Sequence, residues 1–180
     1  MESMHTAIRN GDIQSVARLL DSDPAQLETP DERGWCAIHT ACECGNSSIV
    51  RLLIERGADV NAQTDDGLYC TALDMAAGNG SAGVVELLLS AGARLDIRDD
   101  YEHTPIHTAA IYGRPKALEA LICAGADVND RVDGWTPLTY AEAHIEDRQS
   151  RPRFSEHVPS ATEEEYEAVV TILRRYGGVI

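Results

Sequence analysis

Short apolar stretches at helical spacing recur along the chain, separated by glycines and polar connections. Three such stretches occupy residues 50–54, 84–89 and 118–122. Each is followed by a glycine suited to the left-handed conformation of a helix end, namely Gly57, Gly92 and Gly125. A run of small residues, 106–112 before Gly113, precedes the third stretch. The pattern predicts pairs of short helices, which must stack because one pair cannot bury its apolar face alone.

Two sequence markers repeat with a shared period. The tripeptide His-Thr-Ala begins at positions 5, 39 and 107, and Asp74-Met75-Ala76 stands between the last two, so that successive intervals are 34, 35 and 33 residues. A second string begins with Gly-Ala at positions 57, 92 and 125, which are 35 and 33 residues apart. Two different markers on one period indicate a tandem array of similar units.

The segments from Asp31 to Asn61 and from Asp99 to Asn129 resemble the ankyrin repeat, which reads roughly Asp-x-x-Gly-x-Thr-Pro-Leu-His-x-Ala-Ala and later Gly-Ala-Asp-Val-Asn. The resemblance covers nearly the whole chain. It implies an all-α solenoid of about five stacked helix-turn-helix units with hairpin-like connecting loops. We expect a single domain over 1–180, with an N-terminal cap at 1–30, full repeats at 31–63, 64–98 and 99–130, and a C-terminal repeat at 131–180.

Some positions depart from the family pattern. Asp74 and Thr139 replace the usual histidine, so the hydrogen-bond network of that histidine is in doubt at both places. Glu102 stands where a turn glycine is expected. The stretch 67–71 holds two extra residues, so we expect this loop to protrude.

The C-terminal repeat carries a polar insertion at about 145–161. Thr162 and Glu165 form a capping-box pattern that predicts the start of the next helix. Insertions of this length are typically either functional or disordered, and both readings stay open here. If the insertion is functional, its arginines would clamp an acidic element or fold back on an acidic groove; they are Arg148, Arg151 and Arg153.

Charge and composition narrow the choice of partners. The chain has 15 Lys and Arg against 30 Asp and Glu, a net charge of −15. Such a charge repels phosphate backbones and anionic lipids, so we expect no nucleic acid and no membrane as partner, and a cationic one is favoured. No basic and apolar leader and no apolar run of about 18 residues is present in the sequence, which predicts a cytoplasmic protein. The five cysteines fit reduced thiols.

One cluster offers potential zinc ligands within nine residues, at Cys36, His39, Cys42 and Cys44. Zinc sites usually draw ligand pairs from two segments, and this cluster has no second pair. The repeat register explains three of the four as turn, structural and buried positions. We therefore expect no metal and no cofactor.

Catalysis has no comparable signal. The chain contains no glycine-rich phosphate loop, nucleophile elbow or metal-binding helix motif. The histidines that the repeat does not explain, His103, His144 and His157, are interpreted as solvated surface residues. We expect a non-catalytic protein with no catalytic residues.

The aromatic residues are few, at 5% of the chain, yet they are unevenly placed. In the ankyrin family the variable hairpin tips and the exposed side of the first helices line a concave binding surface. Carried onto this sequence, that register puts four aromatics on tips and two on first helices: Trp35, Tyr69, Tyr101, Trp135, Tyr112 and Tyr140. Trp and Tyr are enriched in interface hot spots, so we expect these residues to bind a partner. The alternative is that each tip aromatic packs on its neighbouring hairpin.

Acidic residues share the same tips, and those expected to contact the partner are Asp66, Asp100, Glu102 and Asp133. Acids around aromatic anchors would steer a basic protein surface into the groove. A solvated acidic face is the other reading of the same charges.

These observations favour a monomeric, non-catalytic protein-binding module that docks a basic patch of its partner on the concave face. A second hypothesis is a stoichiometric inhibitor or immunity-type protein that blocks a nucleic-acid-handling enzyme by placing acids where phosphates would lie. A third is a regulatory enzyme or metal protein centred on the insertion.

Overall fold

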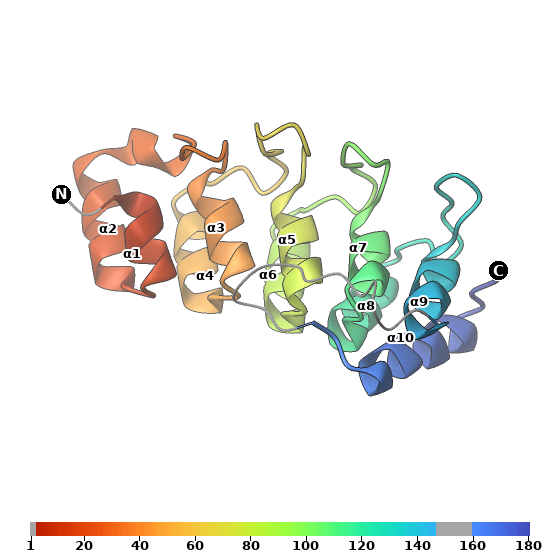
Figure 1. Ribbon diagram of the computed structural model, residues 1–180. Helices are drawn as coiled ribbons and strands as arrows, with labels where there is room; N and C mark the ends of the chain where they lie inside the picture. The colour runs from red at the N-terminus through yellow and green to blue at the C-terminus, as the bar shows by residue number, and fades with distance from the viewer. Residues whose placement is uncertain (1–2, 147–159) are drawn as a thin grey trace.

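The computed structural model describes residues 3–146 and 160–180. In these residues the helices come in five pairs that stack from one end of the molecule to the other (Figure 1). The pairs are α1 (Met4–Arg9) with α2 (Ile13–Ser22), α3 (Ala37–Glu43) with α4 (Ser47–Glu55), α5 (Ala72–Asn79) with α6 (Ala82–Ser90), α7 (Pro105–Ile111) with α8 (Pro115–Cys123), and α9 (Pro137–Glu146) with α10 (Glu163–Arg175). A short 3₁₀ turn, η1 (Pro24–Leu27), follows α2. The predicted all-α solenoid is confirmed.

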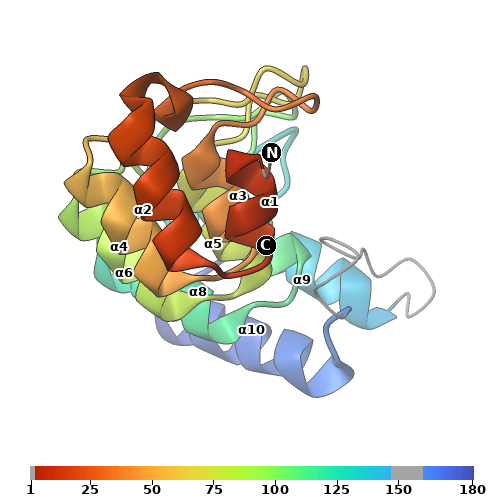
Figure 2. The same cartoon turned by 90° about the vertical axis from the view of Figure 1, so that its left-hand side faces the viewer.

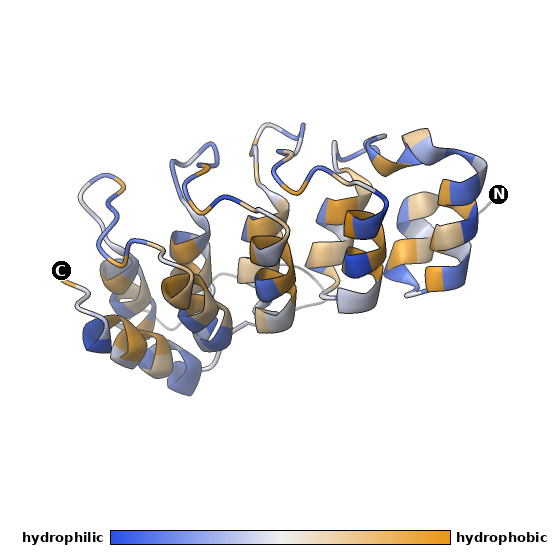
Figure 3. Cartoon of the chain, turned by 180° about the vertical axis from the view of Figure 1, so that it is seen from behind, coloured by the Kyte–Doolittle hydropathy of each residue, from blue (hydrophilic) through white to orange (hydrophobic). Residues whose placement is uncertain are grey.

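The helices form two layers. The first helices contact one another in the order α1, α3, α5, α7 and α9, and the second helices in the order α2, α4, α6, α8 and α10. Viewed along the stack, the connecting hairpins gather at one edge of the molecule (Figure 2). Hydrophobic residues concentrate in the helices, whereas the hairpins are mostly hydrophilic (Figure 3).

The core explains why the two layers use different residues. The first helices bury small side chains without any exposed surface, including Ala41, Ala76 and Ala109. The second helices bury leucines that are equally inaccessible: Leu53, Leu88 and Leu121. Small residues let the first helices approach closely, and the leucines fill the space between the layers. This is the pattern of short helix pairs that the apolar stretches predict.

Reciprocal hydrogen bonds fix where several helices begin. Capping boxes start α3 at Cys36, α5 at Thr71 and α7 at Thr104. At α10 the Thr162 hydroxyl accepts a 3.2 Å hydrogen bond from the Glu165 N–H, and the Glu165 carboxylate accepts a 2.8 Å bond from the Thr162 N–H. The helix start predicted at Thr162 is confirmed.

Neighbouring hairpins are joined through their backbones. The Asp65 N–H donates to the Gly34 carbonyl at 2.8 Å, and the Asp100 N–H donates to the Leu68 carbonyl at 2.9 Å. Gly34 has a positive φ of 78°, and a Cβ atom there would lie 2.3 Å from the Asp65 carbonyl oxygen. Only glycine allows this approach without displacing the next hairpin.

The last helix departs from the arrangement of the other second helices. It lies across the ends of α8 and α9 and packs on both (Figure 1). Tyr166 of α10 is fully buried, and its hydroxyl donates a 2.7 Å hydrogen bond to the Ile111 carbonyl at the end of α7. This helix therefore covers the C-terminal end of the core. Most of the insertion predicted at 145–161 lies outside the described residues, as do Arg148, Arg151, Arg153 and His157.

Candidate functional site

The hairpins and the first helices enclose a pocket of about 430 Å³, which we call the central groove. Three of the predicted aromatic residues line it: Trp35, Tyr101 and Tyr112. Its acidic lining residues are Glu43 of α3, Asp74 of α5 and Asp99 of the hairpin before α7. Apolar and neutral side chains complete the lining: Leu68, Cys70, Met75, His103, Thr108 and Ile111. Among the residues that the structure describes, no lysine and no arginine lines it.

Trp35 is held in place by contacts from both sides. Its indole Nε1 donates a 2.8 Å hydrogen bond to the Asp66 carboxylate on the next hairpin. The Arg33 guanidinium carbon lies 3.9 Å from the centroid of the indole ring. Arg33 also approaches Glu43, with 3.7 Å between Nη2 and Oε2. Trp35 therefore packs on its neighbouring hairpin and still presents part of its surface to the groove.

Beside the central groove, toward the C-terminal end, aromatic rings form a cluster of their own. His103 and Tyr140 share a 3.1 Å hydrogen bond between Nε2 and the phenol oxygen. The Trp135 and Tyr140 ring centroids are 5.4 Å apart, and Tyr101 stacks on His103 at 6.0 Å. Tyr101 and Trp135 are 62% and 45% exposed, so the edge of this cluster is open to a partner. Burial lowers the pKa of His103, which keeps its ring neutral near pH 7.

Tyr69 stands apart from both clusters. Its side chain is 48% exposed, beside Leu68 at 41%. The Gln63 amide donates a 2.7 Å hydrogen bond to the Tyr69 carbonyl, which ties the base of the loop. The loop over 67–71 thus exposes two large apolar side chains at its tip, while its backbone contacts the next hairpin.

The predicted acidic residues divide into two groups. The Asp66 carboxylate accepts hydrogen bonds from the Trp35 indole, the Thr64 hydroxyl and the Leu68 N–H. Burial acts to raise the pKa of Asp66, but these hydrogen bonds outweigh it and hold the pKa below its ordinary value. The other group is exposed and makes no side-chain ion pair within the described residues: Asp100, Glu102 and Asp133.

Sequence reasoning missed a cation among the tips. Arg98 forms an ion pair of 2.8 Å with Asp130 and also donates to the Glu102 carbonyl. Its partner lies 32 residues away, so no local signal marks the pair. Asp130 is therefore neutralised within the fold, whereas the exposed acids at the tips are not.

Three non-glycine residues have a positive φ in the part of the chain that the structure describes, and each is a predicted contact residue. They are Tyr69 at 54°, Glu102 at 62° and Asp133 at 52°. Left-handed backbone costs an ordinary residue about 1–2 kcal/mol. Glu102 adopts the conformation for which the family uses glycine, as its position in the repeat indicates. The chain thus keeps large or charged side chains at tips where glycine would be less strained.

Asp74 shows what replaces the repeat histidine in the groove. His39 and His107 donate through Nε2–H to the carbonyls of Ala62 and Asp130, at 2.9 and 3.2 Å. The shorter Asp74 side chain retains only the cap at the helix start: its Oδ2 accepts from the Thr71 N–H at 2.8 Å and from the Thr71 hydroxyl at 2.6 Å.

The second carboxylate oxygen of Asp74 is buried and has no hydrogen-bond partner among the residues that the structure describes. Burial is the largest influence on this group and raises the pKa of Asp74 to about 7. At the other replacement, the Thr139 hydroxyl accepts a 2.8 Å hydrogen bond from the Thr136 N–H. Asp74 and Thr139 thus both keep the capping hydrogen bond at the start of their helix. Asp74 also places a buried carboxyl group in the lining of the groove.

The cysteine and histidine cluster has structural partners. His39 is fully buried and its Nδ1 accepts a 3.1 Å hydrogen bond from the Cys36 N–H. Burial raises the pKa of Cys42 and Cys44 thiols, so neither is activated as a thiolate. Within residues 3–146 and 160–180 no group of three or more His, Cys, Asp or Glu side chains is arranged to hold a metal ion.

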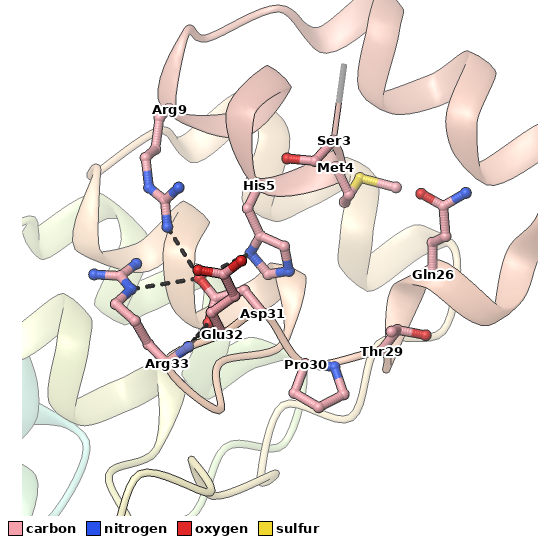
Figure 4. A pocket seen from close by; sticks show the side chains of 10 residues that line it. All are labelled: Ser3, Met4, His5, Arg9, Gln26, Thr29, Pro30, Asp31, Glu32 and Arg33. Atoms are coloured by element: carbon pink, nitrogen blue, oxygen red, sulfur yellow. Dashed lines mark hydrogen bonds and ion pairs between the residues drawn. The ribbon is translucent and has the colours of Figure 1, made fainter. Parts of the chain in front are cut away.

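A separate pocket of about 670 Å³ lies at the N-terminal end between α1 and the first hairpin (Figure 4). Its centre is Asp31, which pairs with Arg9 at 3.0 Å and with Arg33 at 3.4 Å. His5 lies 3.8 Å from the same carboxylate and also bonds to Thr40. The Asp31 carboxylate in this pocket is thus compensated by two arginines.

Comparison with known proteins identifies the family. The stacked helix pairs define a helical repeat solenoid. A family model described as ankyrin repeats (3 copies) matches residues 1–64 and 73–148, and one described as ankyrin repeats (many copies) matches 48–89. The chain belongs to the ankyrin-repeat family, whose members generally act as non-catalytic modules for protein–protein interaction.

Its relatives include proteins of different overall organisation. The chain is 36% identical over 118 residues to a probable 26S proteasome regulatory subunit p28 of Saccharomyces cerevisiae. This match covers 63% of this chain and 51% of the yeast protein. It is 38% identical over 104 residues to a fem-1 homolog A-like protein of Mus musculus, covering 58% of this chain and 15% of the mouse protein. It is 30% identical over 129 residues to a transient receptor potential cation channel subfamily A member 1 homolog of Caenorhabditis elegans. This match covers 72% of this chain and 10% of the Caenorhabditis elegans protein.

The chain thus spans about half of the yeast relative and far less of the other two. What it shares with all three is the repeat array. No helix within the described residues has the length and apolar character needed to cross a membrane.

Proposed function

We propose that this protein binds a partner protein through the central groove and the aromatic cluster beside it, and that the partner presents a basic segment. The observation that carries the proposal is the lining of the groove, which combines three carboxyl groups and three large aromatic side chains and includes no lysine or arginine from the described part of the chain. Aromatic side chains supply contact area, and the carboxyl groups of Asp74 and Asp99 favour a cationic partner, whereas Glu43 already approaches Arg33.

The exposed acids at the hairpin tips extend the negative electrostatic potential of the groove. Asp100 and Glu102 stand on one hairpin and Asp133 on the next, and within the described residues none of the three forms a side-chain ion pair. Such a row accelerates encounter with a basic surface, and its effect declines as salt screens it over about 10 Å at 0.1 M ionic strength. The binding should therefore weaken as ionic strength rises.

The test compares one groove residue with a matched residue elsewhere. Tyr101 at the groove is 62% exposed, and Tyr176 beyond α10 is 40% exposed. A partner captured from the source cell at low salt should lose affinity for Tyr101→Ala and Trp135→Ala but not for Tyr176→Ala. Truncation of a hot-spot aromatic costs about 2 kcal/mol, close to thirtyfold in Kd. Equal affinity for all three variants would refute the groove as the binding site.

A second function rests on the same tip acids. A row of unpaired carboxylates can occupy the phosphate-binding surface of a nucleic-acid-handling enzyme, which would make the protein a stoichiometric inhibitor. An activity assay separates the two proposals: the captured partner loses its activity at one equivalent if the protein is an inhibitor, and keeps it if the protein is a scaffold.

A further inference from the structure

We infer that the central groove contains a receptor site for one lysine side chain of the partner, seated between Trp35 and Tyr112 above Asp74 and Asp99. The inference rests on the proposed function and specifies which partner group enters the groove.

Three properties of the groove point to a cation as its occupant. Its volume of about 430 Å³ exceeds that of one lysine side chain, and its walls include aromatic and aliphatic side chains. Aromatic faces attract a cation, and Met75 and Ile111 offer an apolar surface to a methylene stem. The third property is the Oδ1 atom of the lining residue Asp74, which is buried and has no hydrogen-bond partner in the described part of the chain. A charged carboxylate in that position is stabilised by a cation placed nearby.

The arrangement of oxygens favours an ammonium over a guanidinium. Asp99 uses Oδ1 to accept hydrogen bonds from the Tyr101 and His103 N–H groups, at 2.9 and 2.8 Å. Its Oδ2 lies 3.8 Å from His103 Nδ1, beyond hydrogen-bond distance. Asp74 likewise has one oxygen engaged and one unpartnered. Single oxygens from two carboxylates suit a compact charge with three donors, whereas arginine prefers both oxygens of one carboxylate.

The titratable groups around the site give it a distinct pH dependence. Asp74, with a pKa of about 7, is half protonated at neutral pH in the free protein. Facing it, burial raises the pKa of Cys70 to about 12 and raises the pKa of Tyr112, so both are neutral from pH 6 to 8, and burial lowers the pKa of His103. Burial also raises the pKa of Asp99, whose carboxylate lies beside His103, and Glu43 faces the groove beside Arg33. Lysine binding should therefore expel a proton from Asp74 and strengthen as the pH rises from 6 to 8.

Binding of a small probe tests the site without the partner. The probe is Nα-acetyl-lysine methylamide, and the readout is the indole N–H signal of Trp35 in a two-dimensional NMR spectrum. The chain has two tryptophans, so Trp135, which does not line the groove, is the internal reference. We expect the lysine probe to shift the Trp35 signal saturably and the Trp135 signal little. The uncharged norleucine analogue should bind at least tenfold more weakly, and the arginine analogue more weakly than lysine.

Two conservative variants test the roles of Asp74 and Asp99 in binding lysine. Asp99→Asn retains the Oδ1 acceptor of the turn, and Asp74→Asn retains an acceptor for Thr71, so both preserve the local hydrogen bonds. Each should weaken lysine binding about tenfold, and Asp74→Asn should also abolish its dependence on pH between 6 and 8. The site is refuted if norleucine binds as well as lysine, if arginine binds better, or if Trp35 does not respond. Unchanged pH dependence in Asp74→Asn overturns the role of Asp74.

These outcomes are separable from failure of the proposed function. Loss of partner affinity in Tyr101→Ala together with an unresponsive Trp35 signal would retain the groove as a binding surface and remove the lysine site. A saturable lysine response together with unchanged partner affinity in every groove variant would retain the lysine site and remove the groove as the binding surface for that partner. The cation site would then lie outside the interface.

Discussion

Trp35 and Asp66 join two neighbouring hairpins, because the indole Nε1 of one donates a 2.8 Å hydrogen bond to the carboxylate of the other. The contact gives one residue two roles, since the ring lines the groove and the nitrogen holds the next hairpin in register. Part of the aromatic set therefore stabilises the solenoid as well as presenting a surface.

The first prediction concerns this bond. Trp35→Phe keeps an aromatic ring but removes the donor and weakens the stacking with Arg33, so the free energy of unfolding should fall by about 1–2 kcal/mol. Urea denaturation measures the change. Tyr101→Phe is the control, because its exposed hydroxyl has no hydrogen-bond partner within the described residues and its loss should cost under about 0.5 kcal/mol. Equal stability of both variants would show that the bond contributes nothing.

The second prediction concerns Asp74 and pH. Its pKa rises from 3.8 in the unfolded chain to about 7 in the fold, mainly through burial. A raised pKa of an acid favours the folded state at low pH, so this contribution is fully present below pH 3.8 and is lost as the pH rises through about 7. Asp74→Asn removes it. The stability of the variant relative to the unsubstituted protein should therefore increase on the order of 2–4 kcal/mol between pH 4 and 7.

Comparison of the two pH curves isolates this effect. Burial lowers the pKa of His39 and His107, the latter to about 4, so both oppose the Asp74 trend by destabilising the fold as the pH falls below 6.5. They are present in both proteins and cancel in the difference. A stability curve for Asp74→Asn that runs parallel to that of the unsubstituted protein would contradict the burial argument.

The third prediction concerns Glu102, whose φ of 62° is strained for a glutamate. Glu102→Gly should stabilise the protein by about 0.5–1 kcal/mol, because the relief of strain exceeds the added entropy of glycine in the unfolded chain. The Arg98 bond survives because it uses the Glu102 carbonyl. Thermal unfolding measures the gain.

Binding measurements on the same variant examine why the strain is kept. If the tip carboxylate steers a basic partner, Glu102→Gly should slow association at low salt and have little effect at high salt. A variant that is less stable than the unsubstituted protein would contradict the strain argument. A variant with unchanged association at low salt would remove Glu102 from the steering surface.

Features that depend on neighbouring residues in the chain were predictable from the sequence. Thr162 and Glu165 are three residues apart, and their capping hydrogen bonds close within one helical turn. The position of Glu102 in the turn fixes its backbone conformation in the same local way. The period of the repeat then supplies the stacking of helix pairs, since each pair has the same apolar faces to bury.

Features that join different repeats were not predictable. Arg98 meets Asp130 across 32 residues, and Tyr166 reaches the Ile111 carbonyl across 55. The hydrogen bond between His103 and Tyr140 likewise depends on how two units pack. For this reason the acids at the tips look equivalent in the sequence, whereas in the fold Asp66 and Asp130 are engaged and Asp100 is exposed.

The last prediction separates backbone conformation from close packing at a hairpin. Gly34 and Gly57 both have a positive φ, 78° and 90°, so alanine at either position incurs the strain of a left-handed residue, about 1–2 kcal/mol. A Cβ at Gly57 meets no atom within 4 Å, whereas one at Gly34 would lie 2.3 Å from the Asp65 carbonyl oxygen. Gly34→Ala must therefore displace the next hairpin, and it should cost about 1–3 kcal/mol more than Gly57→Ala in urea denaturation. It should also perturb the NMR signals of Asp65 and Trp35, because the Asp65 N–H bonds to the Gly34 carbonyl and the Trp35 indole bonds to the same neighbouring hairpin. Equal destabilisation by the two substitutions would mean that the hairpins yield without cost, and the rigidity required of the groove would then have to come from the helices alone.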